Sequence, residues 1–300
     1  MFQGIERGIG MSNPFKTREG GATVTVFAPY DCGNHCPFCV NKEEYADTSS
    51  FSLEKILDSI RQIEAFTPRC DFVFTGGEPL ANLESLQLML DAVPTTHRVF
   101  INTTLPVMND YSEDEVVDFL NGNKGKITCI NVSRHLYKFV EEGNDGIFGK
   151  LQVPTRVNCV LFYNHAPEKM LAFVRRFAPW NVPIQFRADY TKTTPENLYD
   201  ESDDEILRDL RSILKPTLLE GCRIRCNYEF LDGDHRISYH KTLPYSTITE
   251  TDAEGNTYDI LYDVLIKQNG DFHSDWTGVQ MDLEDYKKVV FEPYDLHRIF

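Results

Sequence analysis

The sequence has no cluster of basic residues. Its 300 residues include 30 Lys and Arg against 46 Asp and Glu, which gives a formal net charge of −16. Proteins that bind DNA or RNA use clustered Lys and Arg to displace counterions from phosphates. We therefore expect no nucleic-acid polymer among the partners, and a small-molecule or peptide substrate fits the composition better. Of these two, we expect a small molecule.

Long apolar runs are also lacking. No stretch is long enough to cross a membrane, and the N-terminus has no basic-then-apolar signal pattern. The eight cysteines do not follow the regular spacing of a disulfide framework, which indicates a reducing compartment. We expect a cytoplasmic protein that does not bind membranes. Cys70, Cys129 and Cys159 are not expected to be metal ligands, and the last two, which lie within apolar strands, are expected to be small buried apolar residues.

Three cysteines stand in one short run, Cys32-Gly-Asn-His-Cys36-Pro-Phe-Cys39. The spacing C-x3-C-x2-C offers three thiolates, one fewer than a closed tetrahedral zinc site needs. Thiolates also bind iron–sulfur clusters, and three ligands on four irons would leave one iron open for chemistry. Phe38, beside the last ligand, would shield the cluster edge from water. A zinc site completed by a fourth cysteine or by His35 is the alternative.

A second motif follows the next expected strand, Asp71-Phe-Val-Phe-Thr-Gly76-Gly77-Glu78-Pro79. Gly76 and Gly77 let the backbone approach a ligand closely. Glu78 supplies a negative charge, and Pro79 stiffens the exit from the turn. Such a site would suit the ammonium group of an amino acid, whereas the alternative is an ordinary Gly-Gly turn.

Together, the cysteine motif at 32–39 and the Gly-Gly-Glu-Pro at 76–79 resemble those of the radical S-adenosylmethionine enzymes. The resemblance implies that Cys32, Cys36 and Cys39 hold a [4Fe–4S] cluster, whose fourth iron chelates S-adenosylmethionine. Reductive cleavage of that cofactor then yields a 5′-deoxyadenosyl radical, which takes a hydrogen atom from the substrate. An electron donor such as flavodoxin or ferredoxin would be a partner.

Strands and helices alternate over residues 22–215. We expect strands at 22–27, 71–75, 98–102, 127–132, 156–162 and 183–188. This alternation predicts an α/β fold with a parallel, curved sheet, and the partial (β/α)6 barrel of the resembled family has the same strand count. Residues 1–21 would be a lead-in. Residues 216–300 would form a small β-rich extension covering the barrel opening, with 258–266 as its clearest strand.

Polar residues near the ends of these strands are further candidates, because ligands bind at the C-terminal edge of parallel α/β sheets. Candidate cofactor-binding residues, besides Phe38 and residues 76–79, are Asn102, Thr104, Ser133, Arg134 and Asn158. Arg134 would pair with the carboxylate of the methionine moiety. Candidate substrate-binding residues are His135, Arg187 and Asp189. For each of them, a strand-end cap or a satisfied buried polar group is the alternative.

The expected function is hydrogen abstraction from a small organic substrate, with nucleosides, nucleotides and deazapurines as candidates and a lyase as one reaction class. An auxiliary cluster needs three or four cysteines, and only Cys222 and Cys226 follow the barrel, which argues against the peptide-modifying branch that carries such clusters. That branch remains an alternative. A cluster- or zinc-binding protein without radical activity is the other.

Overall fold

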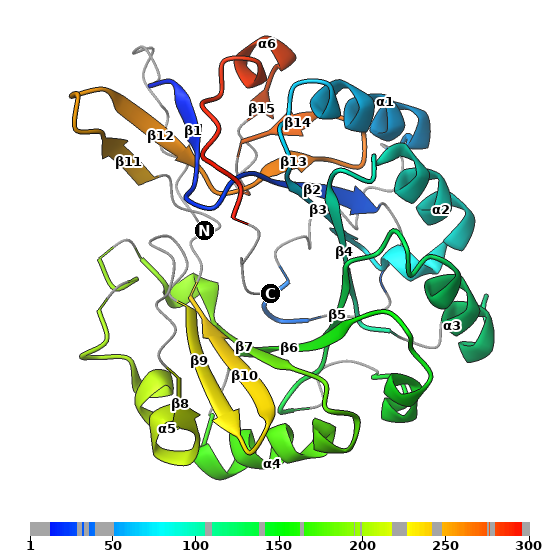
Figure 1. Cartoon of the computed structure of the whole chain (residues 1–300), viewed down its shortest axis with the longest axis vertical. Helices are drawn as coiled ribbons and strands as arrows, with labels where there is room; N and C mark the ends of the chain where they lie inside the picture. The colour runs from blue at the N-terminus through cyan, green and yellow to red at the C-terminus, as the bar shows by residue number, and fades with distance from the viewer. Residues whose placement is uncertain are drawn as a thin grey trace.

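Most of the strands form one large curved sheet, and helices cover its outer face (Figure 1). The computed structural model describes residues 13–28, 32, 36–39, 51–105, 110–137, 142–162, 165–194, 196–198, 200–217, 227–241, 248–274, 276 and 280–295. In spatial order its strands are β15 (Gln280–Met281), β14 (Phe272–His273), β13 (Val264–Ile266), β2 (Thr23–Ala28), β3 (Asp71–Gly76), β4 (Arg98–Thr103), β5 (Cys129–Ser133), β6 (Thr155–Leu161), β7 (Ile184–Ala188), β10 (His235–His240), β9 (Asn227–Asp232) and β8 (Lys215–Pro216).

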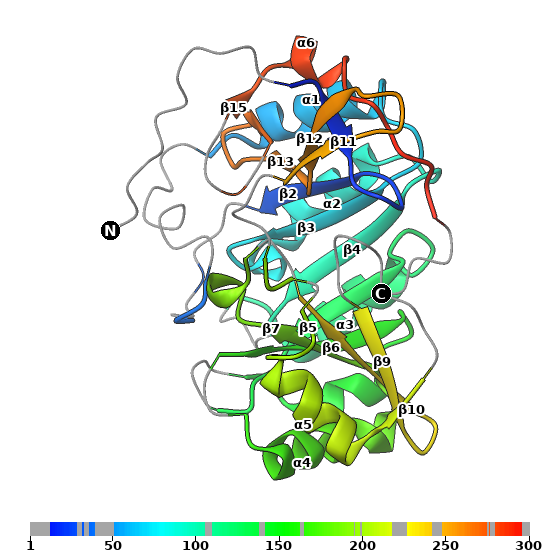
Figure 2. The ribbon, with the colours of Figure 1, turned by 90° about the vertical axis from the view of Figure 1, so that its left-hand side faces the viewer.

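The eight neighbouring strands from β13 to β10 are all parallel, and Figure 2 shows β2 to β7 from the side. The predicted α/β fold with a parallel sheet is confirmed, and its six expected strands are β2 to β7. Two more parallel strands flank them, β13 beside β2 and β10 beside β7. Both come from the C-terminal third, where the turn sequences suggested only hairpins.

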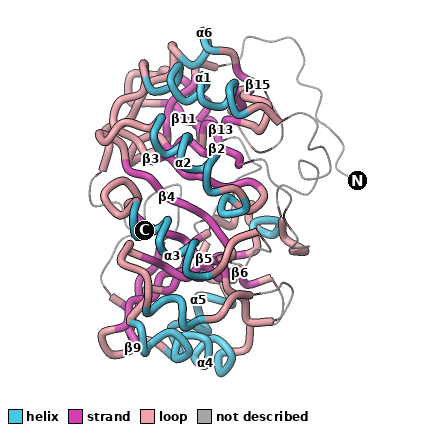
Figure 3. The backbone as a smooth tube through the Cα atoms, turned by 90° about the vertical axis from the view of Figure 1, so that its right-hand side faces the viewer, coloured by secondary structure: helices cyan, strands magenta, loops and turns pink. Residues whose placement is uncertain are grey.

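Helices lie on the outer side of the sheet, and Figure 3 shows α1 to α3 in front of the strands. The helices are α1 (Leu53–Glu64), α2 (Leu83–Ala92), α3 (Glu113–Gly122), α4 (Pro167–Phe177), α5 (Glu205–Ile213) and α6 (Leu283–Tyr286). Short 3-10 helices are η2 (Pro79–Ala81), η3 (Asp145–Gly149), η4 (Ala178–Trp180) and η5 (Tyr190–Lys192). Among the described residues, no helix combines the length and the apolar character needed to span a bilayer.

The two faces of the sheet differ in chemistry. Alternate residues such as Val26, Phe74 and Ile101 are fully buried in one apolar core together with helix residues such as Ile60. The opposite face of the same strands is polar. Parallel strands are usually apolar on both faces, so the polar inner face is a departure that points to a ligand-binding interior.

The expected strand at 258–266 is divided between two sheets. Its first half, β12 (Thr257–Leu261), pairs with β1 (Phe15–Thr17) and β11 (Ile248–Thr251) in a small three-stranded sheet. Its second half is β13, in the main sheet. The chain changes sheets at the buried Asp263, which lies 3.9 Å from Arg18.

The C-terminal segment crosses the N-terminal ends of β3 and β4. The Tyr294 hydroxyl donates to the fully buried Asp71, and its ring lies 5.1 Å from the Arg98 guanidinium. Asp71 also accepts from Arg98 Nε at 2.9 Å. Residues 291–295 therefore close the edge of the sheet opposite to the one where parallel sheets bind ligands.

This contact yields a stability prediction. Tyr294→Phe keeps the ring and removes one hydrogen bond to a buried carboxylate, so it should lower the free energy of unfolding by about 2 kcal/mol. Tyr258→Phe is the matched control, because this tyrosine is half-buried on β12 and stacks only its ring on Lys16. Urea unfolding measures both variants, and equal midpoints for the two would contradict the assignment.

Candidate functional site

The cysteine loop lies at the C-terminal edge of the sheet. Cys32, Cys36 and Cys39 are half-buried, and the Cys39 amide donates to the Cys36 carbonyl at 3.1 Å, which makes a tight turn. Within the described part of the chain no three candidate side chains are gathered as a metal site. The ligand assignment therefore rests on the motif and on the soft thiolate chemistry that suits iron–sulfur clusters. His35, Cys222 and Cys226 lie outside the described residues.

The remaining cysteines behave as expected for non-ligands. Cys70 and Cys159 are fully buried, and Cys129 is half-buried. Burial raises the pKa of the Cys159 and Cys129 thiols, which disfavours the thiolate that a metal would need.

Phe38 anchors the cysteine loop to the sheet. Its carbonyl accepts a hydrogen bond from the Tyr190 hydroxyl at 2.7 Å. Its ring packs against His135 at 5.3 Å and Phe162 at 5.7 Å between ring centroids. Because these partners follow β5, β6 and β7, the loop is held over the ends of three strands.

The Gly-Gly turn sits at the end of β3, against the end of β2. Gly76 has φ +113°, and a Cβ there would lie 2.3 Å from the Ala28 carbonyl oxygen. The Gly77 amide donates to that same oxygen at 3.0 Å. Only glycine fits this position, because the backbone conformation is left-handed and the neighbouring strand is in contact.

Glu78 is 2% exposed and caps η2. Its carboxylate accepts four hydrogen bonds, from Leu80 N at 3.2 Å, Thr103 Oγ1 at 2.5 Å, Thr104 N at 2.9 Å and Thr104 Oγ1 at 2.9 Å. Burial raises the pKa of Glu78, while these hydrogen bonds act in the opposite direction. The predicted cofactor residues Glu78 and Thr104 are thus brought into direct contact. Pro79, also predicted, is buried as the first residue of η2.

The Arg134 side chain is buried and binds three protein groups near the ends of β4 and β5. Its Nη1 donates to the Thr104 carbonyl at 2.6 Å and the Ser133 carbonyl at 2.9 Å, and its Nε lies 3.2 Å from Asp145. The side chain is 0% exposed. Three protein groups bind the guanidinium, whereas its Nη2 is buried without a hydrogen-bond partner among the described residues, so the expected pairing with a cofactor carboxylate stays a prediction. The neighbouring His135 contacts Glu142 with its amide at 2.7 Å and its Nδ1 at 3.2 Å.

The inner face of the sheet carries a connected polar layer. Asn131 donates to Asn102 at 2.8 Å and accepts from Arg156 at 2.7 Å. In the sheet register Ser133 lies beside Asn158, and the Asn158 Oδ1 is buried without a hydrogen-bond partner among the described residues. Of the predicted residues, Asn102, Ser133 and Asn158 therefore share this face of the sheet.

Sequence reasoning missed the continuation of this layer. Arg187 pairs in register with His240 at the end of β10, and His240 Nε2 lies 2.8 Å from Gln185 Nε2, both residues being buried. Nothing in the sequence indicates His240 as a site residue, because β10 follows a hairpin turn and its residues show no pattern that predicts parallel pairing with β7.

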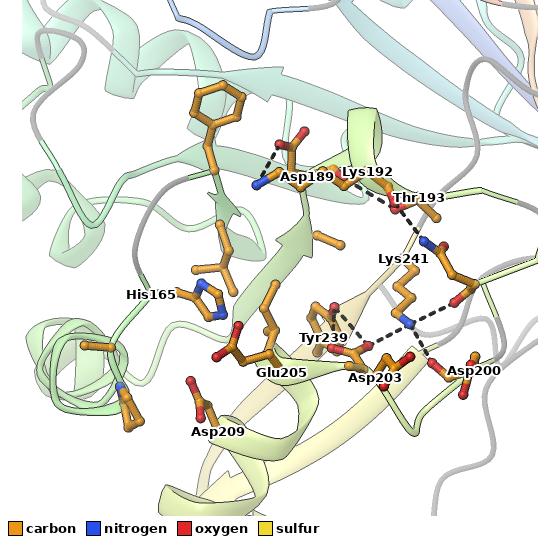
Figure 4. A pocket seen from close by; sticks show the side chains of 18 residues that line it. His165, Asp189, Lys192, Thr193, Asp200, Asp203, Glu205, Asp209, Tyr239 and Lys241 are labelled. Carbon is orange, nitrogen blue, oxygen red and sulfur yellow. Dashed lines mark hydrogen bonds and ion pairs between the residues drawn. The ribbon is translucent and has the colours of Figure 1, made fainter.

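A cavity of about 890 Å³ lies beside the ends of β6 and β7, next to the starts of α4 and α5. Phe162 and Ala188 give it apolar surface, and Figure 4 shows Glu205 and Asp209 directed towards His165. The predicted Asp189 lines it while accepting from Thr191 N at 3.0 Å and Thr191 Oγ1 at 2.7 Å. Since Phe162 also packs on Phe38, the cavity adjoins the cysteine loop.

The Gly76 contact yields a sharp prediction. Gly76→Ala should lower the free energy of unfolding by about 3 kcal/mol or more, because the new Cβ meets backbone that cannot move aside. In Gly122→Ala, the control at the end of α3, the Cβ meets nothing within 4 Å, so that variant should be neutral or stabilised by up to about 1 kcal/mol. Thermal and urea unfolding compare the two; a Gly76→Ala protein as stable as the parent would refute the close approach.

The chain is similar to a known family of domains and to several solved structures. Residues 19–124 match a family model described as a 4Fe-4S single cluster domain. The chain is similar in structure to Streptococcus suis SuiB bound to S-adenosylmethionine, with a TM-score of 0.54, 14% identity and coverage of 91% of this chain and 64% of that one. SuiB bound to precursor peptide SuiA gives a TM-score of 0.51, 14% identity and coverage of 88% and 60%.

A third solved structure, native anSMEcpe with bound AdoMet and Cp18Cys peptide, gives a TM-score of 0.43 at 16% identity, covering 64% of this chain. The chain spans 57% of the length of that structure. The search of curated proteins found no match.

The family match agrees with the predicted [4Fe–4S] cluster, and the structural likeness shows that the chain shares its fold with SuiB, which binds S-adenosylmethionine. They correct the prediction of a small-molecule partner, because the similar SuiB structure is bound to precursor peptide SuiA. The wrong step was to read the missing auxiliary-cluster cysteines as evidence about the substrate. The number of cysteines limits how many iron–sulfur clusters the chain can bind, and it does not indicate which substrate the interior can hold.

Proposed function

We propose that this chain is a radical S-adenosylmethionine enzyme that abstracts a hydrogen atom from a peptide substrate. The carrying observation is that the cysteine loop and the Gly-Gly-Glu-Pro turn both lie at the C-terminal edge of one curved parallel sheet. We interpret residues 22–215 as a partial barrel of the radical S-adenosylmethionine type, with 216–300 adding strands at both sides of it. The family match and the fold shared with SuiB support this proposal.

In this proposal Cys32, Cys36 and Cys39 hold the [4Fe–4S] cluster, and S-adenosylmethionine, which SuiB and anSMEcpe bind, lies at the same edge. With both cofactors bound and a donor such as flavodoxin or ferredoxin to reduce them, the site would have the chemistry needed to abstract a hydrogen atom from a C–H bond. The protein provides orientation and exclusion of competing reactions.

The chain's own residues carry out these two tasks. Phe38, packed between His135 and Phe162, keeps water from one side of the cysteine loop. Gly76 and Gly77 have no side chain, so a ligand could approach the main chain of the half-buried Gly77 closely. The polar layer around Asn102 and Asn158 offers hydrogen bonds on the inner face.

A peptide substrate fits the cavity beside this edge. Its volume of about 890 Å³ lies within the range of ligand-sized pockets and would hold several side chains. Its walls combine the apolar Phe162 and Ile206 with the carboxylates of Asp203, Glu205 and Asp209. We therefore propose that a segment of the peptide lies here and that basic residues in it are favoured.

The function is tested by anaerobic reconstitution with iron and sulfide, followed by S-adenosylmethionine, dithionite and peptides. We expect about one [4Fe–4S] cluster per chain and release of 5′-deoxyadenosine, with faster release when a substrate peptide is present. A preparation that binds one zinc ion and no iron would refute the proposal.

Substitution of one ligand tests the cysteine assignment. Cys36→Ala should abolish the visible absorbance of the reconstituted cluster and the release of 5′-deoxyadenosine, because two thiolates do not hold a cubane that needs three. Cys129→Ala is the matched control, since Cys129 lies on β5 with its thiol pKa raised. Equal iron content in both variants would show that the ligand set is misassigned.

A charge substitution tests the cavity. Asp209→Asn should raise KM for a lysine-containing peptide about threefold to tenfold and leave the affinity for S-adenosylmethionine unchanged, because it removes a charge at the cavity wall. Asp118→Asn, an exposed aspartate on α3, is the control and should change neither value. If both variants retain the parental KM for that peptide and for its lysine-to-alanine counterpart, the peptide does not use this cavity.

A further inference from the structure

The turn that follows β4 has an unfavourable backbone conformation. Leu105 has φ 47°, in the left-handed region that non-glycine residues seldom adopt, and its side chain is 1% exposed. Its carbonyl oxygen is approached by Gly143, where a Cβ would lie only 2.4 Å away. Such a conformation is unfavourable and persists only when its surroundings fix it.

Two buried charged groups fix this turn from opposite sides. On one side, the Glu78 carboxylate accepts from the Thr104 amide at 2.9 Å. On the other, the Arg134 guanidinium donates to the Thr104 carbonyl at 2.6 Å. The N–H and the C=O of Thr104 are therefore each held by an ionisable side chain, one from the turn after β3 and one from the end of β5.

Thr103 links the carboxylate to the strained residue. Its hydroxyl donates to Glu78 Oε1 at 2.5 Å and accepts from the Leu105 amide at 2.8 Å. The Thr103 side chain is buried, with the residue 3% exposed. Glu78, Thr103 and Leu105 thus form one continuous chain of hydrogen bonds, and such chains stiffen the groups they join.

The carboxylate has no acceptor position left for a ligand. An ionised carboxylate offers about four lone-pair sites, and four protein donors already use the Glu78 oxygens. With the residue 2% exposed, an incoming ammonium group would have to break one of these bonds.

We infer that Glu78 is a positioning residue, whose carboxylate acts through Thr103 and Thr104 to hold the turn after β4 at the cofactor edge, and that it does not itself bind the ammonium group of S-adenosylmethionine. This inference rests on the proposed function. It gives Arg134 the complementary role of holding the turn after β4 from the other side.

The test uses Thr103. If S-adenosylmethionine contacted Glu78 directly, the Thr103 hydroxyl would not be needed for cofactor binding. Thr103→Val keeps the shape and removes the hydroxyl, so it should weaken the affinity of the reconstituted enzyme for S-adenosylmethionine about tenfold, as should Glu78→Gln. The double variant should be no weaker than the weaker single variant, because both break one hydrogen-bond chain. Thr103→Ser retains the hydroxyl and should have parental affinity. If Thr103 acted only by packing its γ-methyl, Thr103→Ser would bind S-adenosylmethionine more weakly as well.

Isothermal titration under anaerobic conditions gives the affinities, and cluster absorbance confirms equal loading of all variants. Amide hydrogen exchange of the cofactor-free protein supplies an independent readout. The Thr104 and Leu105 amides should exchange at least tenfold faster in Thr103→Val, and Thr103→Ser should exchange as the parent does.

Outcomes separate the inference from the proposed function. Parental affinity in Thr103→Val together with lost affinity in Glu78→Gln would establish a direct contact and overturn the inference. If the parent itself binds no S-adenosylmethionine, the proposed function fails, and the exchange rates still decide whether Glu78 and Thr103 hold the turn. Unchanged exchange in Thr103→Val would overturn the positioning role in either case.

Discussion

The site depends on a buried carboxylate that joins the ends of two neighbouring strands. Glu78 follows β3, and its four donors come from η2 and from the last residues of β4 and the turn beyond it. Burying such a charge is costly unless every acceptor position is satisfied, and here all are. The same carboxylate brings together the Gly-Gly turn and the turn at 103–105, so the shape of the cofactor edge follows from one set of hydrogen bonds.

Local patterns were sufficient for most of the sheet. The strands β2 to β7 were predicted because their apolar and β-branched runs alternate with helices that carry recognisable caps, such as the capping box at Ser112. The place of the flanking strands β13 and β10 in the main sheet was not predicted. Residues 258–266 read as one strand, but the chain turns at Asp263 and passes from one sheet to the other. No local propensity records a change of sheet, because it is decided by distant partners such as Arg18.

The candidate site shows the same division. The cysteine loop and Gly76 could be recognised from sequence because their chemistry is local: three thiols in eight residues, and a backbone conformation that only glycine adopts. The surroundings of Glu78 and Arg134 could not, since both meet at Thr104, which is 26 residues from Glu78 and 30 from Arg134. His240 was missed because its place on the inner face depends on β10 pairing with β7. Substrate class was missed for a different reason: the cavity proposed to hold the substrate is lined by residues from three distant stretches of the chain, 161–167, 188–209 and 239–241.

The most direct test of the account is electron paramagnetic resonance of the reduced, reconstituted protein with and without S-adenosylmethionine. A cubane with one iron not ligated by protein should give the signal of a single reduced [4Fe–4S] cluster, and that signal should change shape when the cofactor binds to the open iron. A cluster signal that is identical in the two samples would mean that all four irons are already ligated, and the account of this edge as a cofactor site would then be wrong.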